Sequence, residues 1–283
     1  MNILSIQSQV AYGHVGNAAA VFALQRLGHE VWPIPTVEFS NHPAHGGYGG
    51  RINGAGLISG LVEGLKERGF LAQCDAVLSG YMGSVANGAT SLLALEMVQE
   101  QNPTALYLCD PVFGHAGCGI FVADGLPEFF RDKAVPAADI ITPNQFELEW
   151  LTDRKINNLE EALAACQLLR AQGPNTVLCT SLSRADAEEE VIETLLVNAD
   201  GAWLATTKRL DGELFGAGDL FAALYLGHCL TEPDPALVLS RAVSGTWAVL
   251  KATVAKGGGE LALIAAQDDM INLEKLFSVK KIQ

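Results

Sequence analysis

The stretch LFGAGDLFAALYLG, residues 214–227, places two glycines and one carboxylate just before an almost wholly apolar run. Glycines let backbone N–H groups approach a ligand closely, and the positive end of a following helix favours negative charge. We therefore expect residues 216–218 to form an anion hole, with Asp219 as a base beside it. The alternative is that Asp219 only caps a buried helix, a role that contributes about 1 kcal/mol of stability.

Two further carboxylates directly follow apolar, strand-like runs: Asp110 in CDPVFG and Glu147 in PNQFELE. A base beside an anion hole suits the transfer of a phosphoryl group to an alcohol, a reaction that also needs a divalent metal. Carboxylate oxygens hold Mg²⁺ directly or through water, so we expect Asp110 and Glu147 to hold this ion. The alternatives are an Asp-Pro turn at Asp110 and a plain first-turn helix carboxylate at Glu147.

Two glycine-rich segments are candidate lids. His42 and His45 lie three residues apart in NHPAHGGYGG, where no carboxylate or cysteine accompanies them, so a metal site is disfavoured. We expect residues 42–54 to form a lid that excludes water from a reacting group, or else a plain surface loop. Residues 113–120, which contain GHAGCG, have the same two interpretations.

Composition and motifs exclude several classes of protein. The chain has 283 residues, 49% of them hydrophobic, and a net charge of −14 without a basic run, which disfavours nucleic-acid binding. It contains no GxxxxGK(S/T), and GAGLIS at 54–59 lacks the last glycine of GxGxxG. Six scattered cysteines without a CxxC pair favour reduced thiols and a cytoplasmic location. No segment reaches the roughly 18 apolar residues that span a bilayer.

Short apolar runs alternate with segments of helical period along the chain. The runs that predict strands are residues 3–8, 30–39, 75–81, 105–112, 138–142 and 175–182. The segments that predict helices include residues 18–28, 89–101, 159–173 and 235–254. This alternation predicts an α/β fold with a mostly parallel sheet covered on both faces.

Local signals refine this prediction. Pro143 suits the first turn of a helix, and Asn158 followed by Glu161 suggests a capping box. Residues 191–197 and 202–207 flank a turn and predict an antiparallel hairpin. We find no repeat or linker and expect one domain over residues 1–283, with ligands bound beyond the carboxyl ends of the strands.

The blocks LSIQSQVAYGHVGNAAA, FSNH, SGY, CDPVFG, DIITPNQFELE and FGAGDLFAA resemble, in order and spacing, those of the pyridoxal kinases in the ribokinase-like superfamily. GAGD marks the broad superfamily, which includes sugar and nucleoside kinases, whereas IQS with VGN and ITPNQFE points to the vitamin B6 branch. The resemblance covers essentially the whole chain. It implies a ribokinase-like three-layer sandwich, with helices on both faces of a mostly parallel sheet and an antiparallel hairpin at its edge.

The resemblance also implies a reaction and the residues that perform it. The reaction is transfer of the ATP γ-phosphate to the 5′-hydroxymethyl group of pyridoxal, giving pyridoxal 5′-phosphate. The catalytic group comprises Asp219 as the base and Gly216, Ala217 and Gly218 as the anion hole. The substrate residues are Ser8, Phe39, Pro43, Ala44, Tyr81 and Asp219. The ATP residues are Asp110, Thr142, Glu147, Thr180, Thr207, Lys208, Arg209 and Leu210, of which Asp110 and Glu147 serve Mg²⁺ and the two threonines Thr142 and Thr180 line the phosphates or a monovalent cation such as K⁺.

The resemblance further implies a homodimer, and it shows three departures. Many relatives carry a threonine after FSNH, where this chain has Pro43 and Ala44. Some have a lysine in place of Thr180, and some an aspartate in place of His115. Two other functions stay open: a kinase for hydroxymethylpyrimidine, and a binding protein that holds pyridoxal or pyridoxal phosphate without turnover. The acidic groups Asp219, Asp110 and Glu147 argue against a mere binder.

Overall fold

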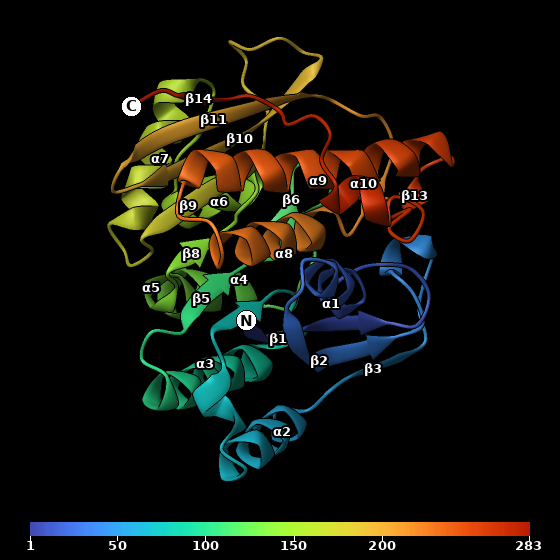
Figure 1. Cartoon of the computed structure of the whole chain (residues 1–283), viewed down its shortest axis with the longest axis vertical. Coiled ribbons are helices and arrows are strands. Elements are labelled where there is room, and N and C mark those ends of the chain that lie inside the picture. The colour runs from blue at the N-terminus through green and yellow to red at the C-terminus, as the bar shows by residue number, and fades with distance from the viewer.

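A ten-stranded sheet runs through the middle of the molecule in the computed structural model, which describes residues 1–283 (Figure 1). The strand order is β14-β11-β10-β9-β8-β5-β4-β1-β2-β3. Six neighbouring strands are parallel: β1 (Asn2–Val10), β2 (Glu30–Phe39), β4 (Ala76–Ser79), β5 (Leu106–Cys109), β8 (Ile140–Ile141) and β9 (Thr176–Leu182). Their carboxyl ends therefore share one edge of the sheet, as the sequence predicts.

Antiparallel strands complete both sides of the sheet. They are β3 (Gly50–Ile52) beside β2, and β10 (Val191–Asn198), β11 (Gly201–Lys208) and β14 (Val279–Lys281) beyond β9. The pair β10–β11 is the expected hairpin. Two small separate sheets pair β6 (Gly114–His115) with β7 (Gly119–Ile120), and β12 (Leu214–Phe215) with β13 (Gly259–Glu260).

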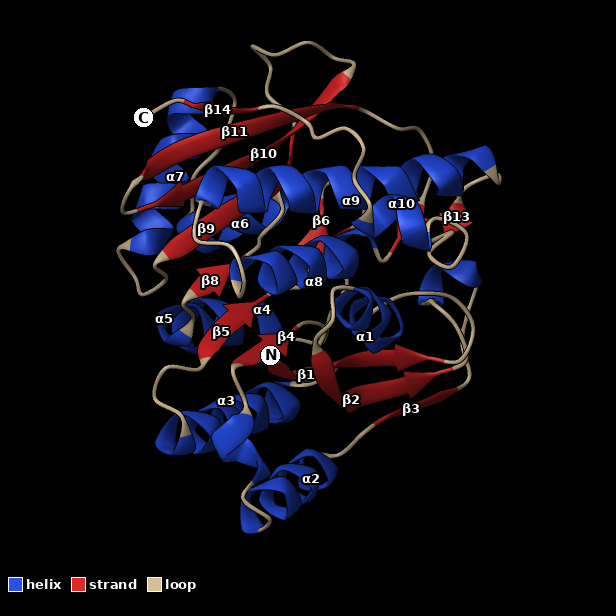
Figure 2. Ribbon diagram, in the orientation of Figure 1, coloured by secondary structure: helices blue, strands red, loops and turns tan.

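Helices cover both faces of the large sheet, which gives the three layers seen in Figure 2. A buried cluster of 30 residues joins one face to α1 (Asn17–Arg26), α8 (Ala217–Cys229), α9 (Pro235–Ala255) and α10 (Gln267–Ile271). A cluster of 37 residues joins the other face to α2 (Ala55–Glu67), α3 (Val85–Gln101), α4 (Leu126–Phe129), α5 (Val135–Ala137), α6 (Gln145–Thr152) and α7 (Leu159–Arg170). The predicted three-layer α/β fold is confirmed. None of these helices is long and apolar enough to cross a bilayer.

Two predicted helix starts need correction. Pro143 is not in the first turn of α6, because Asn144 is the N-cap and forms a full capping box with Glu147. At α7, Asn158 accepts the Glu161 N–H as expected, but the Glu161 carboxylate bonds to Asn157 instead. The chain just before α7 is turned so that the Asn157 N–H, rather than the N-cap amide, faces this carboxylate.

Helix α8 is the best-anchored helix near the glycine-rich stretch. Every residue from Leu220 to His228 is buried, and the helix packs between α1 and α9 (Figure 1). Because the apolar run FAALYL has no free face, the start of α8 is held firmly against the carboxyl ends of the central strands. The buried helix that the sequence suggested thus positions the glycines in front of it.

Candidate active site

The glycine-rich turn before α8 adopts a conformation that only glycine accepts readily. Gly216 is the N-cap, with φ +86° and ψ 4°, and a Cβ atom there would overlap the carbonyl oxygen of His14. The first-turn amides of Ala217, Gly218 and Asp219 have no partner within the helix, as at every helix start. Together with the helix dipole, they make this turn able to bind an anion.

Asp219 lies in the first turn of α8 and is half-buried. Burial raises the pKa of its carboxyl group, while the backbone amide of Gly16 opposes that rise. A carboxylate whose pKa is raised is a stronger proton acceptor than a solvated one. The geometry therefore suits Asp219 to take a proton beside the anion-binding turn.

Asp110 follows β5 and faces the same turn. Its Oδ1 accepts a 2.7 Å hydrogen bond from Thr142 Oγ1, and its Oδ2 would lie 3.8 Å from a Cβ atom built on Gly218. Burial and the nearby Asp219 carboxylate raise the pKa of Asp110 to about 7, which the bond from Thr142 only partly offsets. Two carboxylates held this close favour a cation between or beside them.

Glu147 is buried and its oxygens are occupied by backbone amides. Oε1 accepts from Phe113 N at 3.0 Å and Gly114 N at 3.3 Å, and Oε2 accepts from Asn144 N at 2.9 Å. Burial and Asp110 raise its pKa well above the ordinary range, against these bonds. These bonds hold Glu147 at the start of α6 and against the start of the β6–β7 hairpin, and its Mg²⁺ role stays a prediction. No cluster of three or more His, Cys, Asp or Glu side chains arranged to hold a metal is present.

Of the predicted substrate residues, Phe39 and Tyr81 share one apolar cluster, and Ser8 lies beside Gly16 of the loop after β1. The β1–β2 pairing shifts register between Gln7 and Gln9, which sets Ser8 at an irregularity of the strand, buried against Gly16. Phe39 belongs to a small apolar cluster against which Tyr81 packs. Gly16 thus touches Ser8 on one side and Asp219 on the other, so this predicted substrate residue lies close to the predicted base.

Pro43 and Ala44 lie in an exposed turn, η1 (Pro43–His45), between β2 and β3. The turn rests on Phe215, the residue just before the glycine-rich turn of α8, because the His42 ring stacks on Phe215 with ring centroids 4.4 Å apart. The other candidate lid, residues 113–120, is largely the β6–β7 hairpin. Both segments flank the same end of the sheet as Asp219.

The predicted nucleotide residues lie at the ends of β9 and β11, which point the same way. Thr180 N donates to Pro143 O at 2.9 Å, beside the start of α6. Thr207 is buried, Lys208 is exposed and Leu210 is half-buried. The Arg209 guanidinium donates to Ser183 Oγ at 2.8 Å and to Val191 O at 3.2 Å. These contacts tie Arg209 to the 183–191 segment, and none of them joins it to Asp219.

Several side chains at the site were not among the predicted site residues. Glu260 accepts a bond from His14 N and contacts His45, and Tyr48 covers Phe39 with ring centroids 4.0 Å apart. His45 and Glu260 lie 215 positions apart in the sequence. The residues next to His45 therefore gave no indication of this contact. The run of three glycines before Glu260 is the signal, because all three residues have a positive φ and turn the chain into β13.

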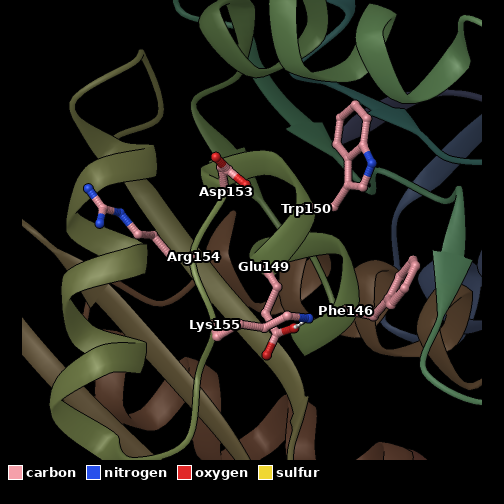
Figure 3. A pocket seen from close by; sticks show the side chains of 6 residues that line it. All are labelled: Phe146, Glu149, Trp150, Asp153, Arg154 and Lys155. Atoms are coloured by element: carbon pink, nitrogen blue, oxygen red, sulfur yellow. Dashed lines mark hydrogen bonds and ion pairs between the residues drawn. The ribbon is translucent and has the colours of Figure 1, made fainter.

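A cavity of about 220 Å³ lies on the outer side of α6 (Figure 3). It is lined by Phe146, Glu149, Trp150, Asp153, Arg154 and Lys155. Lys155 pairs with Glu149 at 2.7 Å across it. None of its residues is a predicted site residue, so this cavity is separate from the site at Asp219.

Comparisons with known proteins agree with this geometry. The family model described as phosphomethylpyrimidine kinase matches residues 66–262. The chain is 50% identical to a pyridoxal kinase PdxY of Rubrobacter xylanophilus, over 100% of this chain and 98% of the relative. It is 47% identical to a pyridoxal kinase PdxY of Deinococcus radiodurans, over 100% and 97%.

Solved structures show the same likeness. A pyridoxal kinase from Leishmania donovani in complex with ADP and pyridoxamine superimposes with a TM-score of 0.93 at 27% identity, covering 100% of this chain and 99% of the other. The chain belongs to the pyridoxal kinase family.

Proposed function

We propose that this protein transfers the γ-phosphate of ATP to the 5′-hydroxymethyl group of pyridoxal, giving pyridoxal 5′-phosphate and ADP. The observation that carries the proposal is the placement of Asp219 in the first turn of α8, beside Asp110 and the glycine turn. The names of the curated relatives and the ligands of the Leishmania structure support it.

The chemistry follows from the positions of these groups. Asp219 accepts the proton of the 5′-hydroxyl group while the oxygen of that hydroxyl bonds to the γ-phosphorus. The bond from that phosphorus to the oxygen bridging to ADP breaks, and ADP leaves with the electron pair. The amides of residues 216–218 stabilise the charge on the transferring group, because they are held in place before the reaction. Ser8, Phe39 and Tyr81, with Pro43 and Ala44 above, hold the pyridine ring.

We also propose that ATP binds with Mg²⁺. Asp110 fits such an ion, because burial and Asp219 already raise its pKa to about 7 and a cation would relieve that strain. When bound, Mg²⁺ neutralises part of the phosphate charge. Glu147 is the second proposed Mg²⁺ residue, directly or through water, and it also accepts hydrogen bonds from the amides of residues 113–114. Thr142 and Thr180 are proposed to line the nucleotide phosphates or a monovalent cation such as K⁺, and residues 207–210 are proposed to hold the nucleotide.

The proposal has three further parts: a homodimer, a cytoplasmic location and two lids at residues 42–54 and 113–120. The six cysteines are all free, which supports a reducing compartment. Light scattering on the purified protein tests the dimer. A mass equal to one chain would contradict it.

The decisive experiment measures ADP release with pyridoxal, pyridoxine, pyridoxamine and hydroxymethylpyrimidine in separate assays. We expect turnover with pyridoxal and loss of activity after thorough chelation of Mg²⁺. Turnover with hydroxymethylpyrimidine alone would make the protein a hydroxymethylpyrimidine kinase instead. Tight vitamer binding without ADP release would indicate a binding protein instead.

A further inference from the structure

Glu260 joins three segments that surround the proposed substrate site. It lies in β13, which pairs in parallel with β12 so that Glu260 is the partner of Phe215, the residue before the anion hole. Its side chain is only 15% exposed. A carboxylate this enclosed needs hydrogen-bond partners, and it finds them in two other segments of the chain.

The first partner is the loop between β1 and α1. Glu260 Oε2 accepts from His14 N at 2.9 Å, and its carboxylate fills the space where a Cβ atom on Gly13 would lie. The carbonyl oxygen of His14 in turn abuts Gly216, and Gly16 faces Asp219. One carboxylate therefore fixes the loop that touches both the anion hole and the base.

The second partner is the segment over the substrate residues. Glu260 Oε1 lies 2.7 Å from His45 Nε2, and the His45 ring packs edge-on against Phe215 with centroids 5.4 Å apart. The His42 ring stacks face to face on the same Phe215 ring. The turn that contains Pro43 and Ala44 is thus clamped at both ends to β12 and β13, although neither Pro43 nor Ala44 offers a side-chain hydrogen bond.

We propose that Glu260 is a positioning residue that latches the 42–49 segment over the substrate through His45 while it holds the 13–16 loop against Asp219. The latch rests on the proposed kinase function. The two arms are separable, because His45→Phe keeps an aromatic ring against Phe215 but removes the contact with Glu260, whereas Glu260→Ala removes both arms. Glu260→Gln keeps an acceptor for His14 N and serves as the conservative variant.

Hydrogen exchange on the free protein tests the latch without any assay of activity. We expect His45→Phe to speed exchange of amides in residues 43–49 only, and Glu260→Ala to speed it in residues 13–16 as well. Glu100→Gln is the matched control, because Glu100 pairs with Lys66 at 2.8 Å between α2 and α3, far along the sequence from the latch. Unchanged exchange in residues 43–49 of both latch variants would overturn the proposal.

Kinetics then separates the two arms. We expect His45→Phe to raise KM for pyridoxal about fivefold with kcat within about twofold, and Glu260→Ala to lower kcat about tenfold in addition. Glu260→Gln should recover most of kcat, and KM for ATP should stay within about twofold in every variant. If Glu260→Ala leaves both constants unchanged while the wild type phosphorylates pyridoxal, the latch is wrong. If the wild type phosphorylates no vitamer yet exchange changes as expected, the kinase proposal fails and the latch stands.

Discussion

At the scale of single residues, the site depends on carboxylates that sit where charge is unfavourable. Burial raises the pKa of Asp219, and burial together with Asp219 raises that of Asp110 to about 7. Such placement opposes the stability of the free protein and is typical of groups that meet a proton or a cation during function. Each carboxylate can be tested by a substitution that keeps the fold.

Asp219→Ala should lower kcat by roughly three powers of ten, because the hydroxyl then loses its proton acceptor while the amides of the turn remain. ATP should still bind, since Asp219 is not among its proposed ligands. Steady-state kinetics together with calorimetric titration of an ATP analogue measures both effects. Near-normal turnover would remove Asp219 from its role as the base.

Asp110→Asn should make the free protein more stable at neutral pH and abolish most activity. In the native state Asp110 has a raised pKa, so between about pH 4 and pH 7 the folded wild type binds more protons than the unfolded chain and loses stability as the pH rises. The variant should therefore exceed the wild type by roughly 2–4 kcal/mol at pH 8, with the difference shrinking toward pH 4. Urea unfolding across this range measures it, and a difference that does not change with pH would contradict the assignment.

Residues that end strands or start helices could be identified from the sequence. Residues whose position depends on contacts between distant parts of the chain could not. Asp110 and Asp219 could be predicted because both flank apolar runs whose ends meet at one edge. The Mg²⁺ role of Glu147, directly or through water, stays a prediction, and three backbone amides from its own turn and from residues 113–114 also bond to its oxygens. Glu260 could not be placed, because its partners lie more than two hundred positions away.

At the scale of elements, the end of α8 away from the site places His228 beside a second buried histidine, His29, which precedes β2. Burial lowers the pKa of His228 to about 4, with Arg241 adding to the effect, and burial also lowers the pKa of His29. His228 Nε2 and His29 Nδ1 have no hydrogen-bond partner within the chain. Both rings are therefore neutral in the folded protein at ordinary pH.

This pair should make the fold sensitive to acid. Below pH 6.5 the unfolded chain protonates His228 while the folded protein does not, so stability falls with pH down to about pH 4. His228→Gln should remove roughly 2 kcal/mol of the loss between pH 6.5 and pH 5. Thermal unfolding at several pH values checks this. An identical pH dependence in both proteins would show that His228 does not titrate on unfolding.

Elements with strong apolar periodicity were predicted well, and short or glycine-containing ones were not. The long helix over residues 235–254 corresponds to α9, and the hairpin to β10 and β11. Helix α2 was missed because its sequence begins with glycines and follows a glycine-rich segment. Its buried residues are few, so packing against α3 rather than local preference decides that it is helical.

At the scale of the whole molecule, a chain with net charge −14 must bind an anionic nucleotide. Remote carboxylates repel ATP over long distances, and salt screens this repulsion. The amides of the glycine turn, and Asp110 through the proposed Mg²⁺, instead act on the bound phosphates at contact distance, where salt screens little. Raising ionic strength from about 0.01 M to about 0.15 M should therefore lower KM for ATP by roughly twofold to threefold. K⁺ and Mg²⁺ are kept constant, and KM for pyridoxal, which carries no phosphate, is the control. A rise in KM for ATP would show that attraction dominates the approach of the nucleotide.

The edges of the sheet could not be predicted at this scale. The alternation of strands and helices indicated a parallel centre, which the order of β1, β4, β5, β8 and β9 confirms. The strands β3 and β14 have three residues each, too few for a periodic pattern. Whether these two segments form strands depends on pairing with their longer neighbours β2 and β11, rather than on their own sequence.

The latch at Glu260 also affects the order in which the protein folds during synthesis. The latch joins residues 13–16, 42–45, 215 and 260, so it is built from distant parts of the chain. During synthesis the first two of these segments emerge long before the last, and the pairing of β12 with β13 cannot form until then. On the proposed latch, a ribosome-bound chain therefore holds its first strands before Glu260 can join them, and we expect vitamer binding only after most of the polypeptide has emerged.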